Sequence, residues 1–405
     1  MKTERAYLDN PGTLEFTAEI IERRVLSDGR LGIVLPKTFF FPTGGGQEHD
    51  TGTIGNRRVV DVIAEDDGTV VHVIDGDVPG MIAPAQIDRE RRFAFMQHHS
   101  AQHLLSQAFA HMLNLETLSA NINIDSPSTI DLDAMPPSEA DVTRVETFAN
   151  SIIHQDLSIK IYWVDETNLH TVPLRKPPKV KENIRIVEIA GFDYSACGGT
   201  HCASTGMIGS IKILKIEKRA DKVRIYFVAG GRALEYYQSY YNTLTQVARL
   251  FDTSPESVFD SVKRLQESFR AAQDELKESE GERLTIEARK WLNAAMSLDT
   301  IRLVTASFRN RAPQQLRALA GLLQNEPGVV AFIASYDGTK ATLLVTCGEN
   351  VGVRANDLIR KALAGINGRG GGDARLAQGG GVADESFIAS CFANAPDYVR
   401  EWRPK

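Results

Sequence analysis

The sequence lacks several features that would define other classes of protein. None of its apolar runs approaches the roughly 20 residues that a membrane-spanning helix needs, and its start has no apolar core of the kind found in signal peptides. Its four cysteines are too few to form a disulfide framework in a chain of 405 residues. A net charge of −6 gives no general attraction to nucleic acid. We therefore expect a cytoplasmic protein without a membrane partner, which contacts RNA only through local basic patches.

What is present predicts an α+β protein of several domains, because roughly 100–200 residues per domain is usual. Residues 1–90 alternate short apolar runs with turn signals such as Ser27-Asp28-Gly29, a pattern typical of a small antiparallel β-barrel or sandwich. From residue 91 to 240 the pattern changes to helices and strands in turn, which indicates an α+β domain.

Residues 241–298 are expected to form a helical linker that resembles a coiled coil. The segment Thr253-Ser254-Pro255-Glu256 offers a hydroxyl cap and an early proline for its first turn. We leave open whether the seam packs within the chain or across a homodimer, which could also form through the C-terminal domain. The seam residues alternate four and three apart: Val258, Val262, Leu265, Phe269, Ala272 and Leu276.

The last part, residues 299–405, shows a β-α-β-β-α order and is predicted to be a small α/β domain. It is expected to contain a glycine-rich loop at residues 365–381, which carries Arg369 and Arg375. Such a loop would let the backbone approach phosphates, although a hinge or linker has the same composition.

Two pairs of residues have the spacing of metal ligands. His99 and His103 lie four apart in a predicted helix, so both imidazoles project from one face. Cys197 and His201 are separated by two glycines and a threonine, and the glycines would free the backbone to curl. A four-coordinate zinc ion is the economical interpretation. The alternatives are a core histidine pair and a tight turn beside a buried cysteine.

The residues do not decide what such an ion would do. Ser100 follows His99, so the glutamate of a zinc protease motif is absent. The ion could lower the pKa of a bound water, or hold the substrate while bulk water attacks. Cys202 follows the second pair directly and could compete as a ligand.

Four segments in this order resemble the editing half of alanyl-tRNA synthetase and its free-standing relatives, the AlaX editing proteins. They are FPTGGGQ at 41–47 with DTG at 50–52, HHSAQH at 98–103, CGGTH at 197–201, and KRADKVRIYFVAGGRAL at 218–234. The glycine-rich tail with AQGG at 377–380 is similar to the C-terminal domain of the synthetase and of the long form of AlaX. Phe41, where many relatives have tyrosine, and Cys202 depart from the family pattern.

The resemblance implies a function and a role for each matching residue. His99, His103, Cys197 and His201 would hold one zinc ion. Thr43 would recognise the hydroxyl of a serine and Gln47 would help to position the ester, so both count as catalytic-site residues. The substrate would be tRNA(Ala) mischarged with serine or glycine, and hydrolysis would release the amino acid without any aminoacylation activity. A pocket that pairs a hydroxyl spares alanine, which would leave it unpaired.

Basic residues in two regions are candidate contacts for the tRNA. One patch surrounds Pro177-Pro178 and includes Arg175, Lys176 and Lys179, and Arg369 and Arg375 supply charge in the C-terminal part. A second run of basic residues lies between 212 and 224. Such runs are more often solvated faces.

The alternative function is a non-catalytic protein that binds tRNA or dimerises and has a structural zinc. A phosphoesterase is disfavoured, because aspartate-histidine clusters for a two-metal site are not found.

Overall fold

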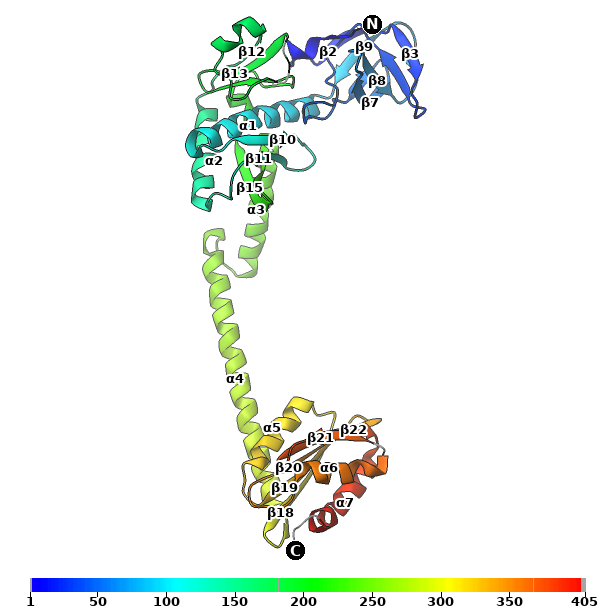
Figure 1. Ribbon diagram of the computed structural model, residues 1–405, viewed down its shortest axis with the longest axis vertical. Helices are drawn as coiled ribbons and strands as arrows, with labels where there is room; N and C mark the ends of the chain where they lie inside the picture. The colour runs from blue at the N-terminus through cyan, green and yellow to red at the C-terminus, as the bar shows by residue number, and fades with distance from the viewer. Residues whose placement is uncertain (1, 179, 181, 367, 402–405) are drawn as a thin grey trace. The chain divides into compact units, whose positions relative to one another are not determined.

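The computed structural model describes residues 2–178, 180, 182–366 and 368–401, and the chain divides into two compact units, Met1–Pro255 and Glu256–Lys405 (Figure 1). Each unit has its own hydrophobic cores, and both mix helices with sheets, which agrees with the predicted α+β class. The finer division at residues 90, 240 and 298 stays a prediction. No helix in the described part of the chain is both long and apolar enough to cross a membrane.

The first unit begins with a seven-stranded antiparallel sheet, in the region where a barrel or sandwich was predicted. The strands at the two ends of this sheet follow one another directly in the chain. Between them, Ile20 N–H donates to Met81 O at one end of the sheet, and Ile21 N–H donates to Val34 O at the other. That segment therefore joins the two ends of the sheet, as closure requires. The order is β2 (Glu15–Glu19), β9 (Ile82–Ile87), β6 (Gly52–Ile54), β7 (Arg57–Ala64), β8 (Val70–Ile74), β4 (Leu31–Val34) and β3 (Glu22–Val25).

A short parallel pair, β1 (Glu4–Arg5) and β5 (Lys37–Thr38), ties the chain start to this sheet. The one-turn helix η1 (Ala6–Leu8) follows and buries Tyr7. These two elements hold Arg5 and Tyr7 where they line the site described below.

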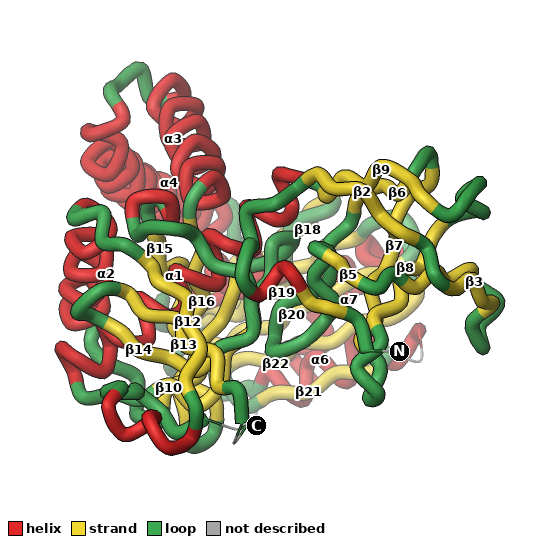
Figure 2. Tube along the Cα trace, turned by 90° about the horizontal axis from the view of Figure 1, so that it is seen from above, coloured by secondary structure: helices red, strands yellow, loops and turns green. Residues whose placement is uncertain are grey.

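The centre of the first unit is a four-stranded antiparallel sheet with two helices packed against it (Figure 2). Helix α1 (Arg89–Leu113) confirms the helix predicted to carry His99 and His103. The second helix is α2 (Glu139–His154), and the Ser138 side chain caps it by accepting from Asp141 N–H. The strands are β10 (Thr117–Asn121), β11 (Ser128–Leu132), β16 (Lys222–Ala229) and β15 (Ile211–Arg219).

A separate three-stranded antiparallel sheet carries part of the site. It consists of β12 (Ile159–Val164), β13 (Ile184–Ile189) and β14 (Asp193–Ala196), with the short helices η2 (Glu166–Thr171) and η3 (Gly206–Ile208) in the connections. Strand β14 leads directly into Cys197. The last long helix of the unit is α3 (Gly231–Leu250), whose second half lies in the segment predicted to be helical and whose first half was not predicted.

The second unit begins with the long helix α4 (Val258–Asn293). A short 3-10 turn, η4 (Pro255–Ser257), precedes it, and Ser257 is the N-cap residue of the α-helix. The first helical turn thus begins at Pro255, directly after the predicted cap at Thr253 or Ser254, and the α-helix itself begins at Val258. The helix runs without a break through Gly281, where the apolar pattern slips.

A six-stranded sheet forms the rest of the second unit, and its order of strands and helices confirms the predicted β-α-β-β-α pattern. Helix α7 (Glu385–Glu401) was not predicted. The sheet order is β17 (Met296–Leu298), β18 (Ile301–Arg309), β19 (Val329–Tyr336), β20 (Lys340–Cys347), β22 (Leu376–Val382) and β21 (Arg369–Gly372), with helices α5 (Pro313–Gln324) and α6 (Ala355–Leu363) and the turn η5 (Ala364–Ile366).

The glycine-rich loop predicted at residues 365–381 is wrong, because most of that range forms strands β21 and β22. The glycines serve close packing against α6. A Cβ on Gly379 would lie 2.3 Å from Leu363 Cδ1, and one on Gly370 would lie 2.9 Å from the same atom. Small residues here let the helix lie on the sheet, which accounts for these two glycines without a phosphate ligand.

Candidate metal centre

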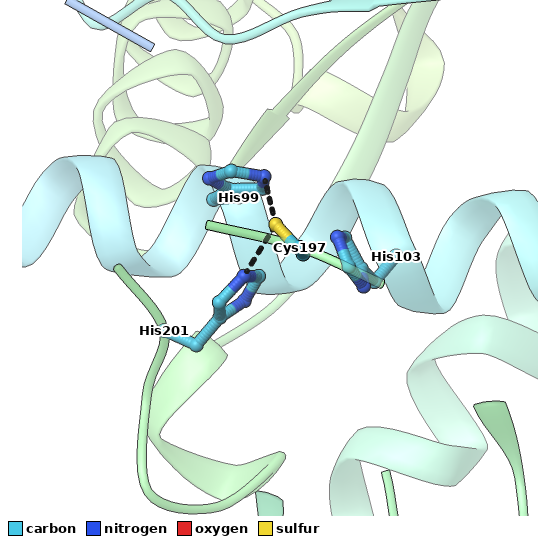
Figure 3. Close-up of side chains that lie close together, drawn as sticks. All are labelled: His99, His103, Cys197 and His201. Carbon is cyan, nitrogen blue, oxygen red and sulfur yellow. Dashed lines mark hydrogen bonds between the residues drawn. The ribbon is translucent and has the colours of Figure 1, made fainter. Parts of the chain in front are cut away.

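Four side chains that were predicted to be metal ligands lie together in the first unit (Figure 3). His99 and His103 project from α1, and Cys197 and His201 come from the loop after β14. Their donor atoms all lie within 4.8 Å of one another. The Sγ of Cys197 is 3.4 Å from His99 Nε2 and 3.3 Å from His201 Nε2. A tetrahedral zinc ion would separate a sulfur and a nitrogen donor by about 3.5 Å, so the spacing fits one common ion.

The outer nitrogens of the three imidazoles face polar side chains. His99 Nδ1 is 2.9 Å from Gln47 Oε1, and His201 Nδ1 is 3.2 Å from Ser100 Oγ. For His103, Nδ1 lies 3.4 Å from Asp193 Oδ2 but lacks hydrogen-bond geometry. Partners of this kind orient ligating histidines. With Nδ1 of His99 and His201 held from outside, their Nε2 atoms point at the cysteine.

The loop between Cys197 and His201 is held close to α1. A Cβ on Gly199 would lie 2.1 Å from His99 Cε1, so only glycine fits there. Arg185 Nη1 donates to Cys197 O at 2.6 Å and to Gly199 O at 3.1 Å. The need for glycine at this position is therefore close approach, whereas the sequence interpretation attributed it to a curled backbone.

Burial lowers the pKa of two of the imidazoles, those of His99 and His201. It lowers the pKa of His99 to about 4, with the charge of Arg185 adding to the effect. Burial also lowers the pKa of His201 well below its usual value, helped by His99 and His103. Both rings are therefore neutral near pH 7, which is the form that binds a metal ion.

The cysteine is poised for the same role. Burial raises the pKa of the Cys197 thiol, but His103, the Gly199 N–H and Arg185 outweigh burial and leave the pKa below its ordinary value. The thiolate is the form that ligates metals. The group can hold a metal ion, and the chemistry of one thiolate and three imidazoles suits a borderline cation.

Cys202 lies outside this group of four, although the sequence left it open as a competitor. It is 1% exposed, and its side chain belongs to the core that packs beneath α1. Burial raises the pKa of its thiol to about 12. Its backbone N–H donates to Ser100 Oγ, so it supports the His201 partner.

Two cavities meet at the four-residue group. The smaller, of about 220 Å³, is lined by Thr43 and the adjacent glycines together with His99 and Cys197. The larger, of about 540 Å³, is lined by the same two ligands, by His103 and by basic residues. A ligand can therefore reach the group from two sides.

The two predicted catalytic-site residues have different surroundings. Thr43 is exposed and lines the smaller cavity, and its Oγ1 accepts from His49 N–H and lies 3.1 Å from His49 Nδ1. Gln47 is buried and lines neither cavity; its Nε2 donates to Thr200 Oγ1 and its Oε1 faces His99. Its contacts within the protein are thus to the ligand group and its loop, and its predicted role toward an ester stays a prediction.

The basic residues predicted to contact tRNA are largely engaged within the protein. Arg175 Nε is 2.8 Å from Asp193 Oδ1, so it supports the carboxylate beside His103. Lys176 donates to Thr117 O, and both basic side chains line the larger cavity. Lys179 lies outside the described residues.

In the second unit Arg369 and Arg375 are exposed on β21 and beside β22. The second basic run is mostly neutralised, since five of its side chains form ion pairs. These pairs are Lys212 with Glu146, Lys215 and Arg219 with Glu217, and Lys222 and Arg224 with Asp131.

Replacing Gln47 by leucine should weaken metal binding by about 10–100-fold, because His99 would lose the partner of its outer nitrogen. Competition for zinc against a chelator of known affinity measures the change. Gln86→Leu on exposed strand β9, where the side chain bonds only Glu15, is the matched control and should leave the affinity unchanged. Equal affinities of wild type and Gln47→Leu would show that this contact does not orient the ligand.

Two segments of the chain match described protein families, and most of the chain matches curated proteins. Residues 184–226 match the family described as the threonyl and alanyl tRNA synthetase second additional domain, and residues 300–401 match the DHHA1 domain. The alanine–tRNA ligase of Methanosarcina mazei is 31% identical over 422 residues, covering 98% of this chain and 44% of the relative. That of Methanopyrus kandleri is 32% identical over 406 residues, covering 94% and 43%.

The chain thus spans less than half of the length of these curated relatives. The crystal structure of the C-Ala domain from Aquifex aeolicus alanyl-tRNA synthetase is also similar, at 30% identity and a TM-score of 0.25, covering 26% of this chain and 96% of that one. The match to both domains defines a protein of the tRNA synthetase editing and C-terminal type. More narrowly, it is an AlaX-like protein related to alanyl-tRNA synthetase, as its motifs predicted.

Proposed function

We propose that this protein hydrolyses the ester of tRNA(Ala) that carries serine, or to a lesser extent glycine, in trans. The observation that carries the proposal is the group of His99, His103, Cys197 and His201 at the junction of two cavities. The relation to alanine–tRNA ligases supports tRNA(Ala) as the partner. We propose zinc as the metal, one ion per chain, because one thiolate and three imidazoles are typical zinc ligands.

A zinc ion at this group would supply Lewis-acid polarisation of the ester or an anchor for the substrate. The protein's own part is to fix the ligands through Gln47, Ser100 and Asp193, and to shape the space around the ester. The smaller cavity, of about 220 Å³, has the size for an amino-acid side chain and little more. The larger cavity is left for the nucleic acid.

Thr43 is the residue that we propose distinguishes serine from alanine. Its hydroxyl has one donor and two acceptor positions. The backbone N–H and the Nδ1 of His49 occupy two of these three hydrogen-bonding positions, so one position is left for a ligand. A serine hydroxyl can fill that position, whereas alanine leaves it unpaired, and the difference lies in the range of one hydrogen bond.

We expect wild-type protein to deacylate Ser-tRNA(Ala) at least about tenfold faster than Ala-tRNA(Ala), and Thr43→Val to lose about tenfold in kcat/KM for the serine ester alone. The measurement is the release of labelled amino acid from tRNA charged with serine, glycine or alanine. Thr17→Val on exposed strand β2 is the matched control and should behave as wild type. An equal loss for all three esters would assign Thr43 a structural role.

The alternative is a structural metal in a protein that binds tRNA without chemistry, and the four protein ligands favour it, because closed sites of this kind are usually structural. Against it, Cys197 is only partly buried and borders both cavities. Purified protein that leaves Ser-tRNA(Ala) unchanged, at concentrations that saturate binding, would decide for the structural role.

The predicted seam supports a homodimer through α4. Within the second unit, four of its side chains are exposed by 45–63%: Val262, Leu265, Phe269 and Leu276. Since their spacing is that of a coiled coil, a second α4 is the occupant that we propose. Light scattering should give about twice the 44.6 kDa of one chain, and Leu265→Lys with Phe269→Lys should halve it. A wild-type mass of one folded chain would contradict this proposal.

A further inference from the structure

The larger cavity beside the metal group is basic in a protein that is acidic overall. Four cationic side chains line it, and the described residues of its wall include no aspartate or glutamate. The net charge of the whole chain is −6, so this separation of charge is local. A wall of this kind binds an anion. The four cations are Arg5, Arg175, Lys176 and Arg185.

Three of these cations are already engaged with the protein. Arg175 pairs with Asp193, Lys176 donates to the Thr117 carbonyl, and Arg185 donates to three backbone carbonyls. Arg5 differs, because its side chain forms no hydrogen bond or ion pair with the described residues. It is partly exposed and borders both cavities, so it is free to contact a ligand.

Two buried guanidinium nitrogens in this wall have no hydrogen-bond partner within the described structure. They are Nε of Arg5 and Nη2 of Arg185, and the Arg185 side chain is only 4% exposed. Buried polar atoms without partners are uncommon, because losing water without replacement costs free energy. An anion held by Arg5, with the fixed charge of Arg185 behind it, would offset that cost.

An aromatic surface borders the same cavity. Trp163 on β12 is 46% exposed, and its Nε1 donates to Asp9 Oδ1 at 2.8 Å, which fixes the ring. Exposed tryptophan beside a cationic groove is the arrangement that binds a nucleotide, since the base stacks on the ring and the phosphate meets the cation. A free carboxylate would make no use of the indole face.

We propose that this cavity binds the terminal nucleotide of the tRNA acceptor end, with its 5′-phosphate at Arg5 and its base on the indole of Trp163. The volume of about 540 Å³ lies within the usual range of roughly 300–1,000 Å³ for a ligand pocket. His99 and Cys197 border both cavities, so the ribose that carries the ester would lie at the metal group. The inference rests on the proposed function, to which it adds the position of the nucleotide.

Binding of adenosine 5′-monophosphate and of adenosine, measured by calorimetry on the full chain, tests this inference without any ester. Wild type should bind the monophosphate about tenfold more tightly than adenosine. Arg5→Gln should bind both equally, while Arg5→Lys should keep part of the preference. Trp163→Ala should weaken both ligands by about tenfold or more, and Trp163→Phe should restore most of the loss.

Arg144→Gln is the matched control, because this exposed arginine on α2 pairs only with Asp141. It should bind both ligands as wild type does. Equal binding of the two ligands by wild type, or a full preference retained in Arg5→Gln, would overturn the assignment of the phosphate. Unchanged binding in Trp163→Ala would overturn the assignment of the base.

The two proposals fail in different ways. Binding that depends on Arg5 and Trp163, in a protein that leaves Ser-tRNA(Ala) intact, would remove the proposed function and keep the nucleotide site. Deacylation with an unchanged KM in Arg5→Gln and Trp163→Ala would keep the function and remove the nucleotide site. A variant that loses ligand binding and also its normal unfolding transition has failed to fold. In that case the conservative variants Arg5→Lys and Trp163→Phe give the result.

Discussion

Alanine at both Cys197 and His103 should reduce the zinc content of the purified protein from about one equivalent per chain to near zero. The two changes remove the only sulfur donor of the group and one of its three imidazoles. Binding of structural zinc by four such ligands is worth roughly 10–16 kcal/mol, and two remaining imidazoles cannot retain an ion during dialysis against a chelator. Elemental analysis of the dialysed variant gives the result directly.

The control for this experiment is Cys202→Ala. Cys202 is the next cysteine in the sequence and directly follows His201, yet its thiol is buried in the core and lies outside the ligand group. The control should keep its zinc. One equivalent retained by the Cys197→Ala/His103→Ala variant would mean that the ion, and with it the proposed chemistry, belongs elsewhere in the protein.

The ligand group could be predicted from the sequence because its two halves are local patterns. The motif HHSAQH offers two neighbouring histidines, and only helical spacing selects His99 with His103. The structure shows that the remaining histidine, His98, has a different role. His98 Nδ1 donates to Ala94 O, and its Nε2 accepts from Ala229 N–H, so it joins α1 to β16. Burial lowers the pKa of His98 to about 4, which keeps it neutral in this bridge.

The residues around the ligands could not be predicted in the same way. Asp193 faces His103 and Arg185 holds the CGGTH loop, but each lies far along the chain from its partner or in a different strand. No periodicity links such pairs, because tertiary packing alone brings them together. Ser100 differs from these two residues, because it lies inside the HHSAQH motif itself. Its partner, His201, belongs to the other motif, so the contact could not be predicted either.

Composition misled the prediction where glycine has two uses. In the second unit the run at residues 365–381 suggested a loop, yet Gly379 and Gly370 sit in strands under α6. A run of glycines occurs in flexible loops and also in strands that another element approaches closely, and the sequence alone does not distinguish the two.

A second large effect is expected at Asp50, the acidic residue of the DTG segment. Arg92 of α1 is 1% exposed and Asp50 is 0% exposed, and Arg92 Nε lies 3.0 Å from Asp50 Oδ1. Asp50 Oδ2 also accepts from Phe41 N–H at 2.6 Å. The pair therefore joins the helix that carries the histidines to the segment that leads into Thr43. Asp50→Asn would leave the Arg92 charge buried without a counter-charge, and should lower the free energy of unfolding by roughly 3–5 kcal/mol.

Urea unfolding followed by circular dichroism measures this loss, with Asp28→Asn as control, because Asp28 pairs with Arg30 on the surface and its loss should be within error. The charge argument has a further consequence. Asp50→Leu combined with Arg92→Met removes both charges, so the double variant should be more stable than Asp50→Asn. If the double variant is the less stable one, the hydrogen bonds from Arg92 to Pro11 O and Phe39 O hold the helix there, and the balance of charge does not.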